Sequence, residues 1–595
     1  MILQALVDYY EVLAESERTP KTGWSLAKVS YAIELSGDGE VLQFISLKSE
    51  QPRGKKMVLS PREMMVPEQA KRSSGISPNF LCDKADYFLG ALLKPEDGMS
   101  EAEKHEIEKS NLRSMQCFEA SRRLHAELLK ECGHPAAKAV VAYYEKWDYQ
   151  NPWNHENVGE NWQDIAASNL VFVFQGAFVH EIEEIKSIWQ QKYEASGSEK
   201  TAVCLISGKR GPVASLHPSI KGVTGAQSSG ASIISFNSDA FCSFGKEQGD
   251  NAPTSKYAAF AYGTALNALI ADYSRVVRVG DMTIVFWAKC GETAYQDSFQ
   301  WLLNPQSSES FYSEADLLGM IRQLAEGKKV LFDNTMLDPS MEFYVLGISP
   351  NAARLSIRMF QKNSFGKMIS NLLEHQERLR IEGQRSSFSI WMLLNETVNP
   401  NASDKTPSPQ LAGDLLRSVI QNSYYPATLL NGVVLRLRAG DKFSQGKAAI
   451  LKAYYLKNKN PKVPEEVLGV MLNTESRNTP YVLGRLFALL EQIQDTANPG
   501  IKSTIRDKYF NSAAATPAVV FPRLINLAQK HLRKIDGGKR VCLEKQLTEL
   551  MSLLETEYPA ILTLPEQGAF QLGYYHQTKA RYQKKDSKQE DSNNE

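Results

Sequence analysis

The stretch GVTGAQSSGASIISFNSDAFCSFGKEQGDNAP, residues 222–253, organises the interpretation of the whole chain. It holds two glycine-rich loops, residues 222–230 and 241–253, on either side of the apolar run 233–236. A short apolar run bounded by turn residues predicts a buried strand. Ser255 predicts the N-terminal cap of a long helix that continues to Ile270. We therefore expect two unusual loops arranged around one strand and one helix.

The charge around the first loop points to an anionic ligand. No Asp or Glu occurs between Thr201 and Ser238, whereas Lys209, Arg210 and Lys221 lie in that window. Glycines let backbone N–H groups approach a ligand closely, and successive N–H groups form a concavity for anions. The first loop therefore suits a phosphate or a nucleic-acid backbone. The alternative is that both loops are ordinary surface loops of a sheet.

Short amide and hydroxyl side chains in and near the loops are candidates for hydrogen bonds to base edges. The alternative is that they bond their own backbone, as turn residues often do. The candidates for motif reading are Gln227, Ser228, Ser229, Asn237 and Asn251.

Composition indicates a globular protein of several domains. The 595 residues are 43% hydrophobic and 23% charged, and this length predicts about three or four domains. No apolar run reaches the length of a membrane span. The seven cysteines are scattered and never in CxxC spacing, which favours reduced thiols in a cytosol over a zinc or disulfide framework.

Charge is balanced overall but unevenly distributed. The chain has 68 basic and 68 acidic residues, which for the whole protein argues against a nucleic-acid binder. Residues 1–350 hold 34 basic and 45 acidic side chains, whereas residues 351–470 hold 17 and 9. A basic middle region can face a polyanion. The alternative is chance variation in surface charge.

The pattern of apolar residues predicts the fold class α+β. Strand and helix patterns are mixed up to residue 363, and from Ser364 every element has helical period. We expect an N-terminal α+β domain (1–363), a helical domain (364–470) and a C-terminal helical bundle (471–595). Residues 395–408 have the composition of a linker, and the polar residues 584–595 predict a disordered tail.

Four arginines in the second half of the chain are candidates for phosphate contacts. Arg354 and Arg358 would share one face of a strand by period-two alternation. Arg436 and Arg438 flank Leu437 on a predicted helix. Arginines of this kind grip phosphates and fix register without reading sequence. The alternative is that all four are solvated surface charges.

Catalytic motifs fail on inspection. His180 and Glu181 begin an HExxH pattern, but Glu184 stands where the second histidine is needed. Residues 440–447 are one residue too long for a P-loop, and Ala448 replaces its Ser or Thr. We therefore expect no catalytic residue, no metal ligand and no cofactor. The rival hypothesis is an anion- or nucleotide-binding hydrolase that uses the loop from Gly222 to Gly230.

Residues 222–253 resemble the signature segment of the large subunit of type I-C CRISPR surveillance complexes (Cascade). Four further segments match the same family in order, so the resemblance covers almost the whole chain. They are FLCDKADYFLG (80–90), YVLGISPNAARLSIR (344–358), YVLGRLFALLEQIQ (481–494) and QGAFQLGYYHQ (567–577).

The resemblance implies a non-catalytic subunit of an RNA-guided complex for antiviral defence in the bacterial cytoplasm. Guide RNA reads the target by base pairing, while the protein reads a short adjacent duplex motif. This subunit would recognise the protospacer-adjacent motif in double-stranded DNA, promote duplex opening and R-loop formation, and support recruitment of a helicase–nuclease. Lys84 and Lys246 join Lys209, Arg210, Lys221 and the four arginines as expected phosphate anchors.

The resemblance also implies partners. They are the CRISPR RNA-bearing backbone and cap subunits, a small subunit, the target double-stranded DNA with its displaced strand, and the helicase–nuclease; no membrane is involved. Residues 471–595 resemble the small subunit, which this family commonly makes from an internal start within the large-subunit gene. Met471 is a plausible start by position.

Overall fold

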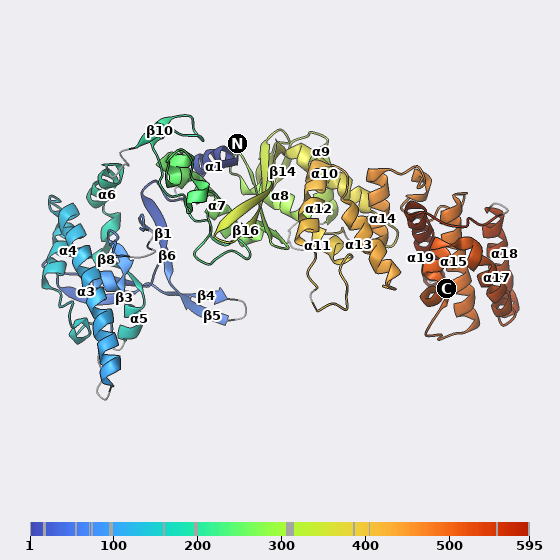
Figure 1. Ribbon diagram of the computed structural model, residues 1–595, viewed down its shortest axis with the longest axis horizontal. Helices are drawn as coiled ribbons and strands as arrows, with labels where there is room; N and C mark the ends of the chain where they lie inside the picture. The colour runs from blue at the N-terminus through green and yellow to red at the C-terminus, as the bar shows by residue number, and fades with distance from the viewer. Residues whose placement is uncertain are drawn as a thin grey trace. The chain divides into compact units, whose positions relative to one another are not determined.

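The computed structural model forms two compact units. It describes residues 2–15, 19–53, 56–70, 72, 75–94, 99–158, 161–195, 200–304, 314–384, 387–403, 405–554 and 557–592. The first unit consists essentially of residues 3–218 and 235–265, and the second of residues 219–234 and 266–595. The chain changes units three times, each time within or beside the stretch that carries the two loops. Figure 1 labels the elements along the chain.

A five-stranded sheet forms the centre of the first unit. β2 (Tyr31–Leu35) runs parallel to β8 (Asn169–Phe174) and antiparallel to β3 (Val41–Ser46). β7 (Cys82–Lys84) and β9 (Ala177–Phe178) pair antiparallel with β8. β8 is buried along almost its whole length, as its apolar sequence NLVFVF predicts.

Helices cover this sheet and complete its core. α3 (Glu101–Leu129) starts in a capping box, because Ser100 and Glu103 bond each other's backbone N–H. α4 (Pro135–Lys146) contributes Tyr143, whose hydroxyl donates to the Phe88 carbonyl at 2.7 Å. The remaining elements that begin in this unit are α1 (Ile2–Glu15), β1 (Trp24–Val29), β4 (Ser49–Arg53), β5 (Lys56–Ser60), β6 (Arg62–Pro67), α2 (Ala85–Phe88), α5 (Trp162–Ala166), α6 (Glu183–Ala195), β10 (Thr201–Val203), β11 (Arg210–Pro212) and α7 (Lys256–Ala271).

The second unit begins with a four-stranded antiparallel sheet in the order β12-β13-β16-β17. These strands are β12 (Val277–Val279), β13 (Met282–Ala288), β16 (Glu342–Asn351) and β17 (Arg354–Ser364). β13 is buried throughout, and β17 is an edge strand. α8 (Thr293–Leu303) packs on β13, followed by α9 (Glu314–Ala325) and the hairpin β14 (Val330–Phe332) and β15 (Thr335–Leu337).

From Phe365 onward, every helix or strand named in the described residues is a helix. This change from mixed structure to helices confirms the predicted α+β class. They are α10 (Phe365–Leu379), α11 (Ile390–Asn395), α12 (Pro409–Gln421), α13 (Ala427–Arg438), α14 (Gln445–Asn458), α15 (Thr479–Ala497), α16 (Ile505–Ala515), α17 (Pro517–Leu532), α18 (Gly537–Ser552) and α19 (Leu564–Ser592). The linker-like residues 395–408 connect α11 to α12, with residue 404 outside the described part.

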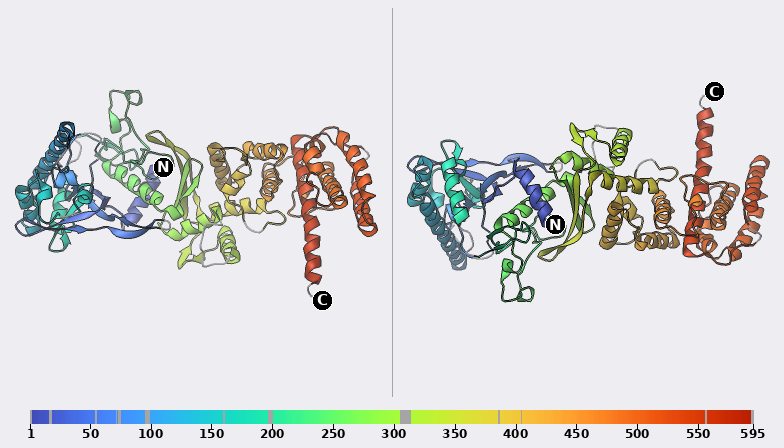
Figure 2. Two further views of the ribbon diagram at one scale, coloured as in Figure 1. Left: turned by 90° about the horizontal axis from the view of Figure 1, so that it is seen from below. Right: turned by 90° about the horizontal axis from the view of Figure 1, so that it is seen from above.

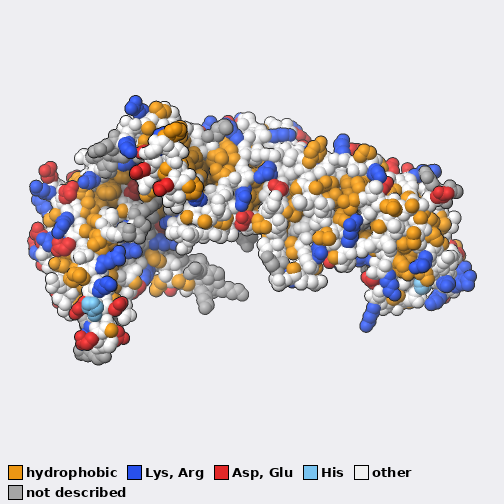
Figure 3. Space-filling model, in the orientation of Figure 1, with side chains coloured by type: hydrophobic (Ala, Val, Ile, Leu, Met, Phe, Trp, Pro, Cys, Tyr) orange, Lys and Arg blue, Asp and Glu red, His pale blue; other side chains and the backbone are white. Residues whose placement is uncertain are grey.

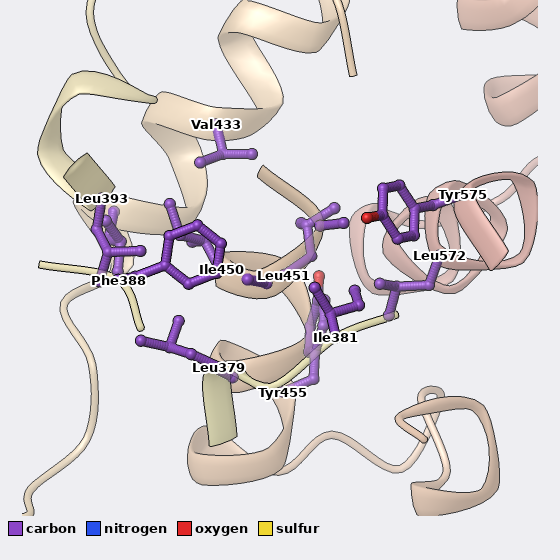
Figure 4. Close-up of a cluster of buried hydrophobic side chains, with 14 of the residues drawn as sticks. Leu379, Ile381, Phe388, Leu393, Val433, Ile450, Leu451, Tyr455, Leu572 and Tyr575 are labelled. Carbon is purple, nitrogen blue, oxygen red and sulfur yellow. The ribbon is translucent and has the colours of Figure 1, made fainter. Parts of the chain in front are cut away.

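One hydrophobic core runs through the second unit from the sheet to α19. Figure 4 shows Ile381, Tyr455 and Leu572 meeting from three separate segments of the chain. The Tyr575 hydroxyl donates to the Glu382 carbonyl at 3.0 Å and ties α19 to the end of α10. The domains predicted with boundaries at residues 363 and 470, and their separate functions, stay predictions.

The run 233–236 differs from the expected buried strand: it forms no strand and is half-buried, and its neighbour Ser232 makes a single parallel bridge to Arg354. Residues 584–592 continue α19, whose last turns project from the bundle in Figure 2. No Pro or Gly between residues 574 and 592 ends this helix. The disorder expected for residues 584–595 stays a prediction, and residues 593–595 lie outside the described part of the chain. Among the described residues, no helix combines the length and apolar character that crossing a bilayer requires.

Candidate nucleic-acid interface

The glycine loop, residues 222–230, is closed at its base by backbone hydrogen bonds. Ile220 and Ala231 exchange both N–H···O bonds at 2.9 Å. Inside the loop, Gly230 N–H donates to the Gln227 carbonyl at 2.9 Å. Gly230 has φ +94°, which a side chain would strain, and an added Cβ would lie 2.9 Å from the Ile220 carbonyl oxygen. The loop is therefore a closed, well-bonded turn that needs glycine at this position.

The sheet of the second unit anchors this loop. Thr224 N–H donates to the hydroxyl of Thr283, a fully buried residue of β13, at 3.1 Å. At the loop's C-terminal end, Leu355 N–H donates to the Ser232 carbonyl at 3.0 Å. Because β17 is the edge strand, this contact seats the loop on the edge of a rigid sheet. A loop held in this way presents its tip in a fixed position.

The tip of the loop carries three of the predicted motif readers. Gln227, Ser228 and Ser229 are all exposed. Lys221 is exposed at the loop entrance, where Asn267 fixes its backbone N–H at 2.9 Å. Arg354 is half-buried at the start of β17, bridged to Ser232. The structure thus places five predicted residues on this loop, at its entrance or on the strand with which it pairs.

The second loop, residues 241–253, belongs to the first unit, whereas the glycine loop belongs to the second. Its Asn251 bonds its own loop: the side-chain oxygen accepts from Ser243 N–H at 2.9 Å, and the side-chain nitrogen donates to the carbonyls of Lys246 and Gln248. These bonds fit the alternative interpretation, in which Asn251 is a turn residue that bonds the backbone of its own loop. Asn237 is exposed in the same unit.

Three predicted lysine and arginine anchors surround this second loop. Lys209 and Arg210 are exposed where the β10–β11 hairpin turns, and Lys246 is exposed on the loop itself. Leu205 N–H donates to the Pro253 carbonyl at 2.9 Å, which ties hairpin to loop. The first unit therefore carries three of the predicted phosphate anchors as exposed cations.

A buried thiol fixes that hairpin to the start of α7. The Cys204 sulfur accepts from Ser255 N–H at 3.2 Å and from Ser207 N–H at 3.5 Å. Burial raises the pKa of Cys204, but hydrogen bonds from Ser207 and Ser255 outweigh it and lower the pKa to about 6. The thiol is 2% exposed, so these bonds serve to position the loop.

Lys84 lies in the first unit on a segment that mainly builds the core. Its neighbour Asp83 is 1% exposed and forms a two-pronged ion pair with Arg72, with N–O distances of 2.8 and 2.5 Å. Burial raises the pKa of Asp83, while bonds from Arg72 and Asn79 oppose that rise. Lys84 itself is exposed on β7. Within this stretch, Lys84 is the residue placed to meet a ligand.

A β-bulge interrupts the alternation predicted for Arg354 and Arg358. Gly347 pairs with Met359 but Ile348 pairs with Ile357, so Arg358 is an extra residue in its strand. The two arginines therefore do not share a face by simple period-two alternation. Arg358 is half-exposed and lies 4.0 Å from the carboxylate of Asp281.

The two arginines of α13 differ in exposure. Arg436 lies 4.0 Å from the Asp441 carboxylate, and both side chains are mostly buried at 13% and 14% exposure. Arg438 is exposed and donates to the Gln567 side chain at 3.2 Å. Arg438 is thus better placed than Arg436 for a phosphate.

Sequence patterns did not reveal the residues that hold the glycine loop. Thr283 and Asn267 lie far along the chain from the loop and carry no motif.

Figure 3 shows acidic and basic side chains interspersed over the visible face of the first unit. The described residues contain no group of His, Cys, Asp and Glu suited to a metal ion.

Comparison with known families agrees with these features. The family model described as CRISPR-associated protein (Cas_Csd1) matches residues 6–582, so the chain belongs to this CRISPR-associated family. This confirms the resemblance seen in the sequence and makes the chain a subunit of a type I-C Cascade. No curated protein matches it significantly.

Proposed function

We propose that this chain recognises the protospacer-adjacent motif of double-stranded DNA with its glycine loop. The observation that carries the proposal is the exposed Gln227–Ser228–Ser229 tip of a loop that has Lys221 at its entrance and pairs with a sheet edge at Arg354. Base recognition needs a few polar groups held rigidly, and phosphate contacts set their register. The loop's closure at Ile220 and Ala231 supplies that rigidity.

Recognition of the motif would be followed by opening of the adjacent duplex and R-loop formation. In this proposal the chain has no catalytic role and supports recruitment of a helicase–nuclease. Its partners would be the guide-bearing backbone and cap subunits, and the helical region would lie along the displaced strand. The complex would work in the bacterial cytoplasm.

The competing hydrolase hypothesis needs a general base beside the loop. His217 is the histidine nearest in sequence. It is buried in the first unit, and its Nδ1 lies 2.7 Å from the Tyr262 hydroxyl. This contact accounts for His217 without a catalytic role.

Binding to a set of duplexes tests the proposal. The assembled complex should prefer one sequence beside the guide-matched segment, by about tenfold or more per good base contact. Its affinity should fall as the logarithm of salt concentration rises, because phosphate contacts release counterions. Equal affinity for every adjacent sequence in a gel-shift series would contradict motif recognition by this complex.

Met471 would give a separate small subunit from an internal start. It is 65% exposed in the segment before α15, outside any helix. An N-terminally tagged chain should then co-purify an untagged fragment of residues 471–595. Met471→Ala should remove that fragment, and its persistence at unchanged size would contradict this start site.

A further inference from the structure

A tyrosine pocket lies in the second unit, away from the glycine loop in sequence and on different elements. It is lined by Tyr424, Tyr454, Tyr455, Asn458, Lys459 and Asn460, where the α12–α13 turn meets the end of α14. Its volume is about 390 Å³, which is in the range of small-ligand sites. We call it the tyrosine pocket below.

The turn that carries Tyr424 is firmly held. Asn458 accepts from Tyr425 N–H and donates to the Tyr425 carbonyl, both at 2.9 Å. The Tyr425 ring is buried, with its hydroxyl 2.6 Å from His375 Nδ1. Tyr424, its neighbour, is 73% exposed. A large aromatic ring is therefore presented to solvent on a rigid support.

The other segment of the lining comes from α14. Tyr455 is 3% exposed, and its ring meets that of Tyr454 edge to face at 5.5 Å. The buried ring therefore limits the orientation of Tyr454, which is only partly buried. Tyrosines from two separate segments thus line one pocket, and Tyr424 and Tyr454 are the ones that keep exposed surface.

Lys459 is the one cation among the described residues that line the pocket. Lys459 has a side chain 79% exposed and lies 3.7 Å from Glu465, which is 76% exposed. An ion pair this exposed is weak and screened by salt, so a phosphate can compete for the lysine. Lys459 ends α14 with φ +45°, so the helix stops where the pocket opens.

We propose that the tyrosine pocket binds an unpaired nucleobase of single-stranded nucleic acid. Aromatic rings stack on any base, and a nearby lysine neutralises the adjoining phosphate. One cation suits a single backbone phosphodiester better than the several charges of a free nucleotide. The inference rests on the proposed function, in which the helical region meets a displaced strand.

Fluorescence anisotropy of the full-length chain with a labelled polythymidine strand of about 15 nucleotides tests the pocket. Tyr424→Ala should weaken binding about 5- to 100-fold, because it removes one stacking surface. Tyr424→Phe should keep the affinity within about twofold, since the ring remains. Tyr273→Ala is the matched control, because Tyr273 is 70% exposed elsewhere in the same unit.

Three results would overturn the pocket: unchanged affinity in Tyr424→Ala, an equal loss in Tyr273→Ala, or competition by thymidine monophosphate at the concentration of the strand. The third result would make it a free-nucleotide site.

The two proposals fail separately. If Tyr424→Ala binds the strand normally while the complex still selects an adjacent motif, the pocket is wrong and motif recognition stands. If Tyr424→Ala no longer binds the strand while the complex binds every adjacent sequence equally, motif recognition is wrong and the pocket stands.

Discussion

Gly484→Ala is expected to destabilise the second unit by about 3 kcal/mol or more. A Cβ at Gly484 of α15 would lie 1.9 Å from the carbonyl oxygen of Phe570 in α19. The reciprocal contact places a Cβ at Gly573 2.1 Å from the Tyr481 carbonyl oxygen. Both obstacles are backbone, so the helices themselves must separate. Because this pair carries much of the C-terminal packing, the loss should be large.

Urea unfolding followed by circular dichroism measures this effect. Gly319→Ala is the matched control, because Gly319 lies within helix α9 with no atom within 4 Å of an added Cβ. That substitution should stabilise the chain by about 0.5–1 kcal/mol, the usual gain from replacing a helical glycine. If both variants unfolded at the same urea concentration, the close approach of α15 and α19 would be wrong.

Replacing Gln227, Ser228 and Ser229 together by Ala should remove most selection among adjacent motifs. Each base-edge contact contributes about 1–3 kcal/mol of discrimination, so the best and worst motifs should converge by about 100-fold or more. The variant should fold normally, because these side chains are exposed and the loop is held by backbone bonds of Ile220 and Ala231.

A competition gel shift with the assembled complex separates base recognition from phosphate contact. Arg354→Ala is the comparison variant, since a phosphate contact should weaken all duplexes alike and leave their order unchanged. The account predicts lost order in the triple variant and kept order in Arg354→Ala. A triple variant with the original motif preference would remove the glycine loop as the reader.

Local sequence signals predicted the elements whose causes are local. Ser255 was expected to cap a helix, and its hydroxyl accepts from Ala258 N–H at 3.2 Å at the start of α7. The change from mixed structure to helices was expected at Ser364, and β17 ends there. Capping and periodicity act within a few residues, so the sequence reports them directly.

Features set by distant residues were missed. The run 233–236 is apolar like a strand, but its neighbour Ser232 pairs with only one residue, at the start of β17. From the sequence Arg436 was a candidate for a phosphate contact, but the turn after α13 places the Asp441 carboxylate 4.0 Å from it. Tyr424 carried no signal, because a pair of adjacent tyrosines is typical of a core as much as of a surface. Each of these features depends on which segments meet in the fold. The periodicity of the sequence does not encode that information.

The same limit applies to the candidate site. Residue types and the acid-free window pointed to the glycine loop, and the structure places its tip in the open. The second loop belongs to the other compact unit, so its pairing with the glycine loop stays a prediction.

The most direct measurement uses 2-aminopurine placed in the first base pairs beside the motif, where its fluorescence rises when the duplex opens. The complex containing this chain should raise the signal only on duplexes with the preferred motif, and a complex assembled without the chain should leave it low. Equal opening with and without the chain would contradict the account.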